Sequence, residues 1–135
     1  NLILATQDPI NKEKKYHKPI KLNNIHIDQE KYWEEIISAM HNVMQGSGTA
    51  KNIGKGAPYK MAGKSGTVQV ISVGQEEEYD QESLDKKFQD HALFVSFAPL
   101  YNPKIAVAVI VENGNSGSRV AAPIARAIMD KYLKH

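Results

Sequence analysis

Two apolar runs in the second half of the chain constrain its fold more than any other feature. Residues 91–98 and residues 104–111 are rich in β-branched and other apolar side chains, and Pro99 with the turn at Asn102-Pro103 separates them. Strands joined by so short a link pair in opposite directions, so we predict an antiparallel hairpin over residues 91–112. The second run is apolar at almost every position, which predicts that it is the more deeply buried of the two.

A helix is predicted on each side of this hairpin along the sequence. Residues 28–45 carry apolar side chains at spacings of three and four, with Asp28 as the expected N-cap and Gly46 as the expected stop. Residues 120–133 form the second predicted helix, with Pro123 in its first turn. The side chains expected to pack on the core are Tyr32, Trp33, Ile36, Ile37, Met40, Val43 and Met44 in the first helix, and Ile124, Ala127, Ile128 and Leu133 in the second.

A third strand is predicted over residues 60–71, which begin Lys-Met-Ala-Gly-Lys-Ser-Gly-Thr-Val-Gln-Val. The order helix, strand, strand, strand, helix predicts the α+β class, in which an antiparallel sheet of this strand and the two C-terminal strands is packed by helices. Alternation along the strand places Ser65 and Thr67 on one face, and Lys64 and Gly66 on the other.

This third strand is also the candidate binding site. At the edge of a sheet it would offer backbone N–H groups, two hydroxyls and a lysine cation to an anionic, peptide-like ligand. Gly66 leaves room for another backbone to lie against the strand. The predicted ligand therefore carries a carboxylate and an acyl group.

Two segments are predicted to lie outside this core. Residues 1–27 are expected to be a loop or linker, because their lysines are accompanied by neither aromatic residues nor a helical stripe. Residues 74–90 are expected to be an acidic, exposed insertion with a short helix near Ser83–Gln89. Nothing shapes the three consecutive glutamates of this insertion into a cage, so no metal site is predicted.

The composition narrows the possible partners. Seventeen Lys and Arg against fifteen Asp and Glu give a net charge of +2 over 135 residues, which disfavours nucleic acid as the main partner. The absence of cysteine excludes a disulfide framework and thiol chemistry. No apolar run reaches the roughly 18–20 residues of a membrane-spanning helix, so we expect any membrane anchor to lie outside this chain.

No convincing nucleophile was found in the sequence. Ser83-Leu84-Asp85-Lys86 matches a Ser-x-x-Lys pattern formally, but no apolar helix accompanies it to bury the lysine. Gly63-Lys64-Ser65 mimics the end of a phosphate-binding loop, yet the position of the required earlier glycine is Pro58. The five histidines lack metal-ligand spacing. A binding strand without an attacking group is what we expect of a fragment of a larger catalytic domain.

Lys64-Ser65-Gly66-Thr67 resembles the third signature, Lys-[Thr/Ser]-Gly, of penicillin-binding proteins and serine β-lactamases. The context resembles class B penicillin-binding proteins over residues 28–132. The stretches that carry this likeness are Gly48-Thr49-Ala50, residues 57–69, residues 90–99 and residues 107–114. The acidic insertion and Ala57-Pro58-Tyr59-Lys60 are most similar to the elongation-specific penicillin-binding protein 2 of Gram-negative bacteria, with division-specific relatives as the nearest competitor.

The resemblance implies a role for each residue of the motif. The family cross-links peptidoglycan as a serine-type D-Ala-D-Ala transpeptidase or carboxypeptidase and is the target of β-lactams. Lys64 would be catalytic, as a cation near the serine of the second motif. Ser65 and Thr67 would bind the substrate carboxylate, and the Thr67 N–H would be one arm of the oxyanion hole. Gly66 would let the ligand backbone lie along the strand.

The resemblance also implies where the chain works and what it lacks. The family's Ser-x-x-Lys and Ser-x-Asn motifs are expected upstream of Asn1, so residues 1–135 would be the C-terminal portion of a single transpeptidase domain and inactive alone. We expect no cofactor and no metal. The location implied is the periplasmic side of the bacterial inner membrane. The implied partners are peptidoglycan stem peptides, β-lactam antibiotics, the remainder of the transpeptidase domain and other cell-wall elongation proteins.

Two other hypotheses remain open. The chain is alternatively a fragment of a β-lactam sensor or β-lactamase, or a non-catalytic interaction module that kept the strand. If the chain is half of a domain, the apolar faces of the Trp33 helix and of the sheet should be uncovered, which favours self-association.

Overall fold

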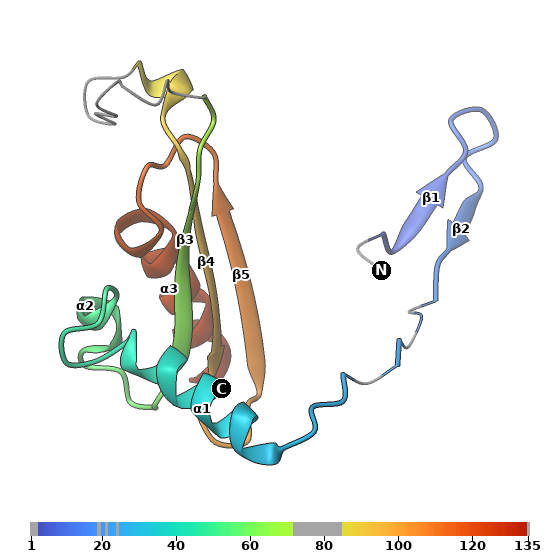
Figure 1. The fold of residues 1–135 in the computed structure, drawn as a ribbon. Helices are drawn as coiled ribbons and strands as arrows, with labels where there is room; N and C mark the ends of the chain where they lie inside the picture. The colour runs from blue at the N-terminus through green and yellow to red at the C-terminus, as the bar shows by residue number, and fades with distance from the viewer. Residues whose placement is uncertain (1–2, 19, 21, 24, 72–84, 135) are drawn as a thin grey trace.

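A three-stranded antiparallel sheet forms the centre of the structure. The computed structural model describes residues 3–18, 20, 22–23, 25–71 and 85–134. The strand order is β3-β4-β5, with β3 at Ala62–Val68, β4 at His91–Ala98 and β5 at Ile105–Val111. In Figure 1, helix α3 (Ala122–Leu133) lies behind the sheet and helix α1 (Glu30–Asn42) crosses in front of the lower ends of the strands. The predicted α+β class with an antiparallel sheet is confirmed.

Strand β4 supplies the centre of the core because it lies between two neighbours. Its alternate residues Ala92, Phe94, Ser96 and Ala98 are buried, as expected for a strand with one face against a helix. Phe94 belongs to the same apolar cluster as Met129 of α3. The register of β4 and β5 is antiparallel throughout, so the predicted hairpin is confirmed.

Strand β5 corrects one expectation about burial. We predicted it to be the more buried strand of the hairpin, but none of its residues is fully buried and Ile110 is 67% exposed. The described residues therefore leave part of the apolar surface of β5 exposed. The reason is its position, because β5 lies at one edge of the described sheet whereas β4 lies inside it.

The N-terminal segment corrects a second expectation. Residues 1–27 were expected to be a loop or linker, but they contain an antiparallel hairpin of β1 (Ala5–Gln7) and β2 (Lys14–Tyr16). The Asp8 carboxylate stabilises the turn by accepting hydrogen bonds from the backbone N–H groups of Ile10 and Asn11. This is the local turn chemistry of an Asp side chain, which the lysine-rich composition obscured. Figure 1 shows the hairpin standing away from the sheet.

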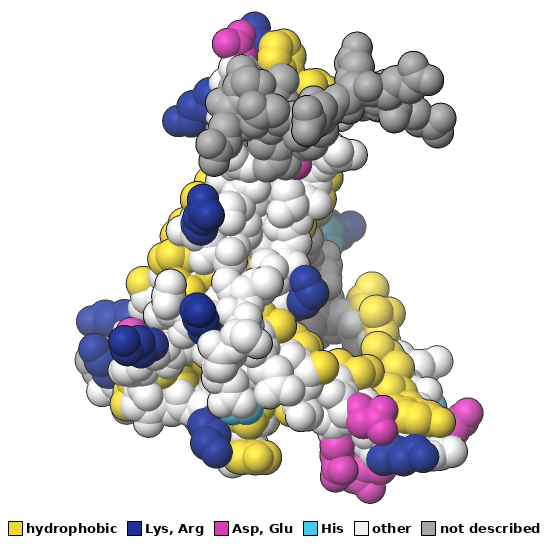
Figure 2. Space-filling view, turned by 60° about the vertical axis from the view of Figure 1, so that its left-hand side comes forward, with side chains coloured by type: hydrophobic (Ala, Val, Ile, Leu, Met, Phe, Trp, Pro, Cys, Tyr) yellow, Lys and Arg dark blue, Asp and Glu magenta, His cyan; other side chains and the backbone are white. Residues whose placement is uncertain are grey.

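Helix α1 is less buried than its apolar stripe suggested. It starts at Glu30, with Gln29 rather than Asp28 in the capping position and no side-chain cap, and it ends at Asn42, earlier than predicted. Trp33 is 41% exposed, and none of the helical residues is fully buried. Figure 2 shows apolar side chains at the surface beside charged ones. Trp33 is therefore not a core anchor within this chain, as expected if another part of the protein covers it.

The face of α3 that packs on the sheet differs from the predicted one. Ala122, Ala125 and Met129 are buried, whereas Ile128 is 44% exposed. Of the predicted stripe, Leu133 packs against the core, and Ile124, Ala127 and Ile128 are exposed. Small alanines allow the helix axis to lie close to the strands, which explains why they take the inner face rather than the larger isoleucines.

The acidic insertion lies mostly outside the described residues, which resume at Asp85. A short 3₁₀ turn occupies Lys86–Phe88, within the region where a helix was predicted. Asp90 was expected in an exposed loop, but it is only 1% exposed, and its carbonyl accepts a hydrogen bond from Asn115 N–H at 2.8 Å. Asp90 thus belongs to the folded core, because the connection after β5 packs over it.

Candidate functional site

Strand β3 carries the Lys64–Thr67 motif along an edge of the described sheet. It pairs with β4 over its whole length, from Ala62 opposite Phe97 to Val68 opposite His91. No other strand in the described part of the chain pairs with β3, so its second side has no strand partner there. Backbone groups on such a side are able to bind an extended, peptide-like ligand.

The motif residues lie on both faces of β3. Ser65 is opposite Phe94 and Thr67 is opposite Ala92, so both hydroxyl residues share the face of the buried core. Lys64 and Gly66 lie on the other face by alternation. Lys64 and Thr67 are exposed and Ser65 is half-buried. Because β3 is an edge strand, residues on both of its faces can border a ligand that lies along that edge.

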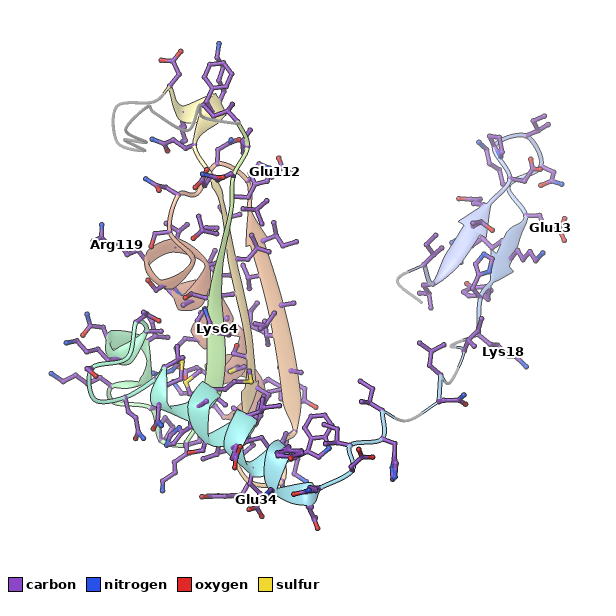
Figure 3. All side chains as sticks on the ribbon, viewed as in Figure 1. Glu13, Lys18, Glu34, Lys64, Glu112 and Arg119 are labelled. Atoms are coloured by element: carbon purple, nitrogen blue, oxygen red, sulfur yellow. The ribbon has the colours of Figure 1, made fainter. Side chains whose placement is uncertain are left out.

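The Lys64 ammonium has no acidic partner in the described residues. Its Nζ donates a hydrogen bond to the carbonyl oxygen of Ser65 at 2.6 Å. An ion pair elsewhere in the described chain joins Arg126 to Asp130. Figure 3 shows Lys64 partway along β3, well away from Glu34 of α1 and from Glu112 beyond the end of β5. This cation is therefore available for an anionic ligand.

Gly117 lies directly against the backbone of the motif. It begins a π-helical turn, Gly117–Ala121, that continues into α3. A β-carbon at Gly117 would overlap the carbonyl oxygen of Leu93 and would lie 2.6 Å from the carbonyl oxygen of Gly66. Only glycine permits so close an approach of two backbones. The motif glycine thus has a structural contact that sequence reasoning missed.

Residues 53–61, which we call the lead-in, deliver the chain to β3. They include the end of the short helix α2 (Lys51–Gly54) and border a cavity of about 300 Å³, which is also lined by His41 and Met44. His41 Nδ1 lies 2.7 Å from the carbonyl oxygen of Met61, so this nitrogen donates the hydrogen bond. None of the motif residues 64–67 lines this cavity, so it adjoins the candidate site without being part of it.

A hydrogen-bonded group joins the lead-in to α3. Tyr59 OH donates to Asp130 Oδ1 at 2.7 Å, and Arg126 Nε donates to the same oxygen at 2.9 Å. Burial, together with the hydrogen bond to Asp130, raises the pKa of Tyr59 to about 12. The hydrogen bond from Arg126, with that from Tyr59, lowers the pKa of Asp130 below its ordinary value. The Arg126 and Asp130 pair at a spacing of four is readable in the sequence, but its link to Tyr59 is not.

Tyr59 is expected to titrate later than an ordinary tyrosine. Its folded-state pKa lies above the unfolded value of about 10, so the stabilising effect of the neutral phenol is complete below that value and is lost as the pH rises through about 12. Alkaline titration of phenolate absorbance, with Tyr59→Phe subtracted, measures this value directly. Asp130→Asn should bring the pKa down, and a wild-type Tyr59 that titrates with the other tyrosines would contradict the geometry.

The remaining sequence candidates add nothing to the site. No group of three or more His, Asp or Glu residues is placed to hold a metal ion in the described chain. Ser83, the formal nucleophile candidate, lies outside the described residues. The assembled site therefore consists of the edge of β3 and the cation of Lys64, together with the Gly117 turn and the lead-in that contact this strand.

Comparison with known proteins places this geometry in a family. Residues 2–130 match the penicillin binding protein transpeptidase domain. The chain is 42% identical to peptidoglycan D,D-transpeptidase MrdA of Haemophilus influenzae, over 87% of this chain and 18% of that protein. It is 40% identical to MrdA of Escherichia coli K12, over 76% of this chain and 16% of that protein. The chain thus spans less than a fifth of the length of these two relatives.

A solved structure agrees with these relatives. Penicillin-binding protein 2 of Pseudomonas aeruginosa, crystallised with WCK 5153, is 39% identical, with a TM-score of 0.69. The match covers 92% of this chain and 25% of that one. The chain is thus similar to penicillin-binding protein 2 in both sequence and fold. The family match over almost the whole chain, together with this shared fold, shows that the chain belongs to the transpeptidase-domain family of penicillin-binding proteins.

Proposed function

We propose that this chain is the C-terminal portion of a peptidoglycan D,D-transpeptidase of the elongation-specific class. The observation that carries the proposal is the exposed Lys64 and Thr67 on an edge strand of the family's fold. The relatives named MrdA are peptidoglycan D,D-transpeptidases, which supports the reaction class. The substrate would be the D-Ala-D-Ala end of a stem peptide, and β-lactams would compete with it.

The proposed chemistry assigns the attacking group to a segment upstream of Asn1. A serine there would attack the penultimate D-Ala carbonyl, release the terminal D-Ala as the bond to it breaks, and pass the acyl group to an amine of a neighbouring strand. Lys64 would attract the substrate carboxylate and assist proton transfer through the serine of the second motif. Ser65 and Thr67 would bind that carboxylate, and the Thr67 N–H would stabilise the oxyanion. No metal or cofactor takes part in this scheme.

The proposed setting follows the same family. We place the whole protein at the bacterial inner membrane with this portion on the periplasmic side, together with other proteins of cell-wall elongation. None of the helices in the described part of the chain is both long and apolar enough to cross a bilayer. The exposed apolar side chains of α1, such as Trp33 and Ile36, would pack against the remainder of the transpeptidase domain.

Labelling with a fluorescent penicillin tests the proposal. The isolated chain should take up no label, because it lacks the serine, whereas a longer form with upstream Ser-x-x-Lys and Ser-x-Asn motifs should form an adduct that survives denaturation. Label on the isolated chain would contradict the assignment of the nucleophile. Rapid release of hydrolysed penicillin from the longer form would favour a β-lactamase, and a longer form that takes up no label would favour an interaction module.

A further inference from the structure

Helix α3 and the turn that precedes it contact the chain at two places, one within the motif and one before it. At one end, Gly117 lies against the backbone of Gly66. At the other end, Arg126 and Asp130 hold the lead-in to β3. Lys64 and Ser65 thus lie between two attachments to one continuous helical segment. The position of the motif is therefore coupled to the position of α3.

The attachment at the lead-in rests mainly on Arg126. Its Nη1 donates to the carbonyl oxygen of Ile53 at 2.5 Å and lies 3.5 Å from that of Lys55. Its Nη2 donates to the carbonyl oxygen of Gly56 at 3.4 Å. The Arg126 side chain is only 18% exposed, and its guanidinium also lies over the ring of Tyr59. A planar guanidinium with five donors is suited to hold several carbonyl groups at once, which a lysine ammonium does less well.

Asp130 completes this attachment. It lies one helical turn after Arg126, so both side chains leave the same face of α3. Its Oδ1 accepts hydrogen bonds from Arg126 Nε and from Tyr59 OH, which orients the guanidinium and fixes the tyrosine. Removal of either partner would leave the other without its orienting contact, so the two residues should act as a unit.

Hydrogen bonds from other elements also fix the last residues of the lead-in, just before β3 begins. Leu100 N–H, just after β4, donates to the carbonyl oxygen of Lys60 at 2.7 Å. His41 Nδ1 donates to the carbonyl oxygen of Met61, also at 2.7 Å. Ala62 then starts the ladder with β4. Only a short stretch of chain therefore separates Tyr59, which Asp130 holds, from the start of β3, so the position of Tyr59 helps to set where β3 begins.

We propose that Arg126 and Asp130 are positioning residues of the proposed transpeptidase, which fix the lead-in so that Lys64 meets the substrate carboxylate and the Thr67 N–H meets the oxygen of the reacting carbonyl. Neither residue belongs to the edge of β3, so both act through Tyr59 and the backbone. This inference rests on the proposed function for its catalytic consequence. A misplacement of about 1 Å at a catalytic group can cost about 10²-fold in rate. A looser lead-in should therefore slow acylation more than it weakens binding.

The test uses the protein with its complete transpeptidase domain. Arg126→Ala should lower the rate constant of acylation by fluorescent penicillin by about tenfold or more, while the binding constant before acylation changes by a clearly smaller factor. Arg126→Lys should recover only a small part of the rate, and Arg126→Ala with Asp130→Ala should be no slower than Arg126→Ala alone. Lys131→Ala, which removes an exposed cation from the same helix, should behave as the wild type.

Amide hydrogen exchange separates local displacement from general unfolding. In Arg126→Ala, the amides of residues 62–67 should exchange faster while those of β5 keep their protection. Two results would overturn the proposal. One is an Arg126→Ala variant that is acylated as fast as an acylated wild type, and the other is exchange that is equally faster across the whole sheet. If the wild type is not acylated at all, the proposed function fails, and the exchange pattern still decides whether Arg126 fixes the lead-in.

Discussion

Replacement of Gly117 by alanine is expected to lower the free energy of unfolding by about 3 kcal/mol. The added β-carbon would overlap the Leu93 carbonyl oxygen and approach that of Gly66. Both oxygens belong to the paired backbone of β3 and β4, so neither can move without disturbing the ladder. The turn before α3 would therefore have to lift from the sheet. Urea unfolding of the protein followed by tryptophan fluorescence measures the change as a shift in the midpoint.

A matched glycine provides the control for this substitution. Gly114 lies in the same connection, and a β-carbon there would meet the side chains of Ala92 and Val111 at 3.0 and 3.1 Å. Side-chain carbons can shift slightly, so Gly114→Ala should cost clearly less than Gly117→Ala. Equal costs for the two variants, or a cost below about 1 kcal/mol for Gly117→Ala, would show that the contact with Gly66 is not rigid.

Replacement of Lys64 by alanine is expected to slow acylation by penicillin by roughly 10²–10⁴-fold in the protein with its complete domain. The substitution removes a cation that would attract the ligand carboxylate and assist proton transfer at the attacking serine. Lys64 is exposed, and among the described residues its ammonium donates a hydrogen bond only to the carbonyl oxygen of its neighbour Ser65, so the fold should be unaffected. The measurement is the second-order rate of adduct formation, taken beside an unfolding curve that should match the wild type.

A nearby lysine controls for the loss of charge. Lys60 is also exposed and lies in the lead-in, where its carbonyl rather than its side chain makes the contact with Leu100. Lys60→Ala removes the same charge at a short distance and should leave acylation within about threefold of the wild type, since exposed charges interact weakly. If Lys60→Ala slowed the reaction as much as Lys64→Ala, the role of Lys64 would be general attraction and not a contact at the reacting groups.

Local patterns predicted most of the elements correctly. The hairpin of β4 and β5 followed from two apolar runs and a proline-containing link, and the alternation along β3 placed Ser65 and Thr67 on one face. The motif itself was visible as consecutive residues, because a strand presents its chemistry within a few positions. The turn at Asp8 is equally local, since its carboxylate accepts from the N–H groups two and three residues further on, but the lysine-rich composition around it does not predict it.

Burial was predicted less well. The periodicity of apolar residues shows which of them share a face of a helix or strand, but it does not show which face another element covers. The exposed Ile128 and the buried Ala125 share α3, and only the close approach of that helix to the sheet determines which of them is inside. The apolar residues of β5 and α1 likewise lie at surfaces that the described chain leaves open. Asp90 was misplaced for the converse reason, because an acidic neighbourhood says nothing about the connection that packs over it.

The sequence alone therefore determined the chemistry that this chain can offer, a lysine, two hydroxyls and a glycine on a strand, because these residues are adjacent and their spacing is that of a strand. The tertiary structure alone decided how that strand is held. Gly117 meets Gly66 and Arg126 meets the carbonyl of Ile53 across long separations in the chain. Such contacts depend on how α3 packs on the sheet, and no local pattern encodes that packing.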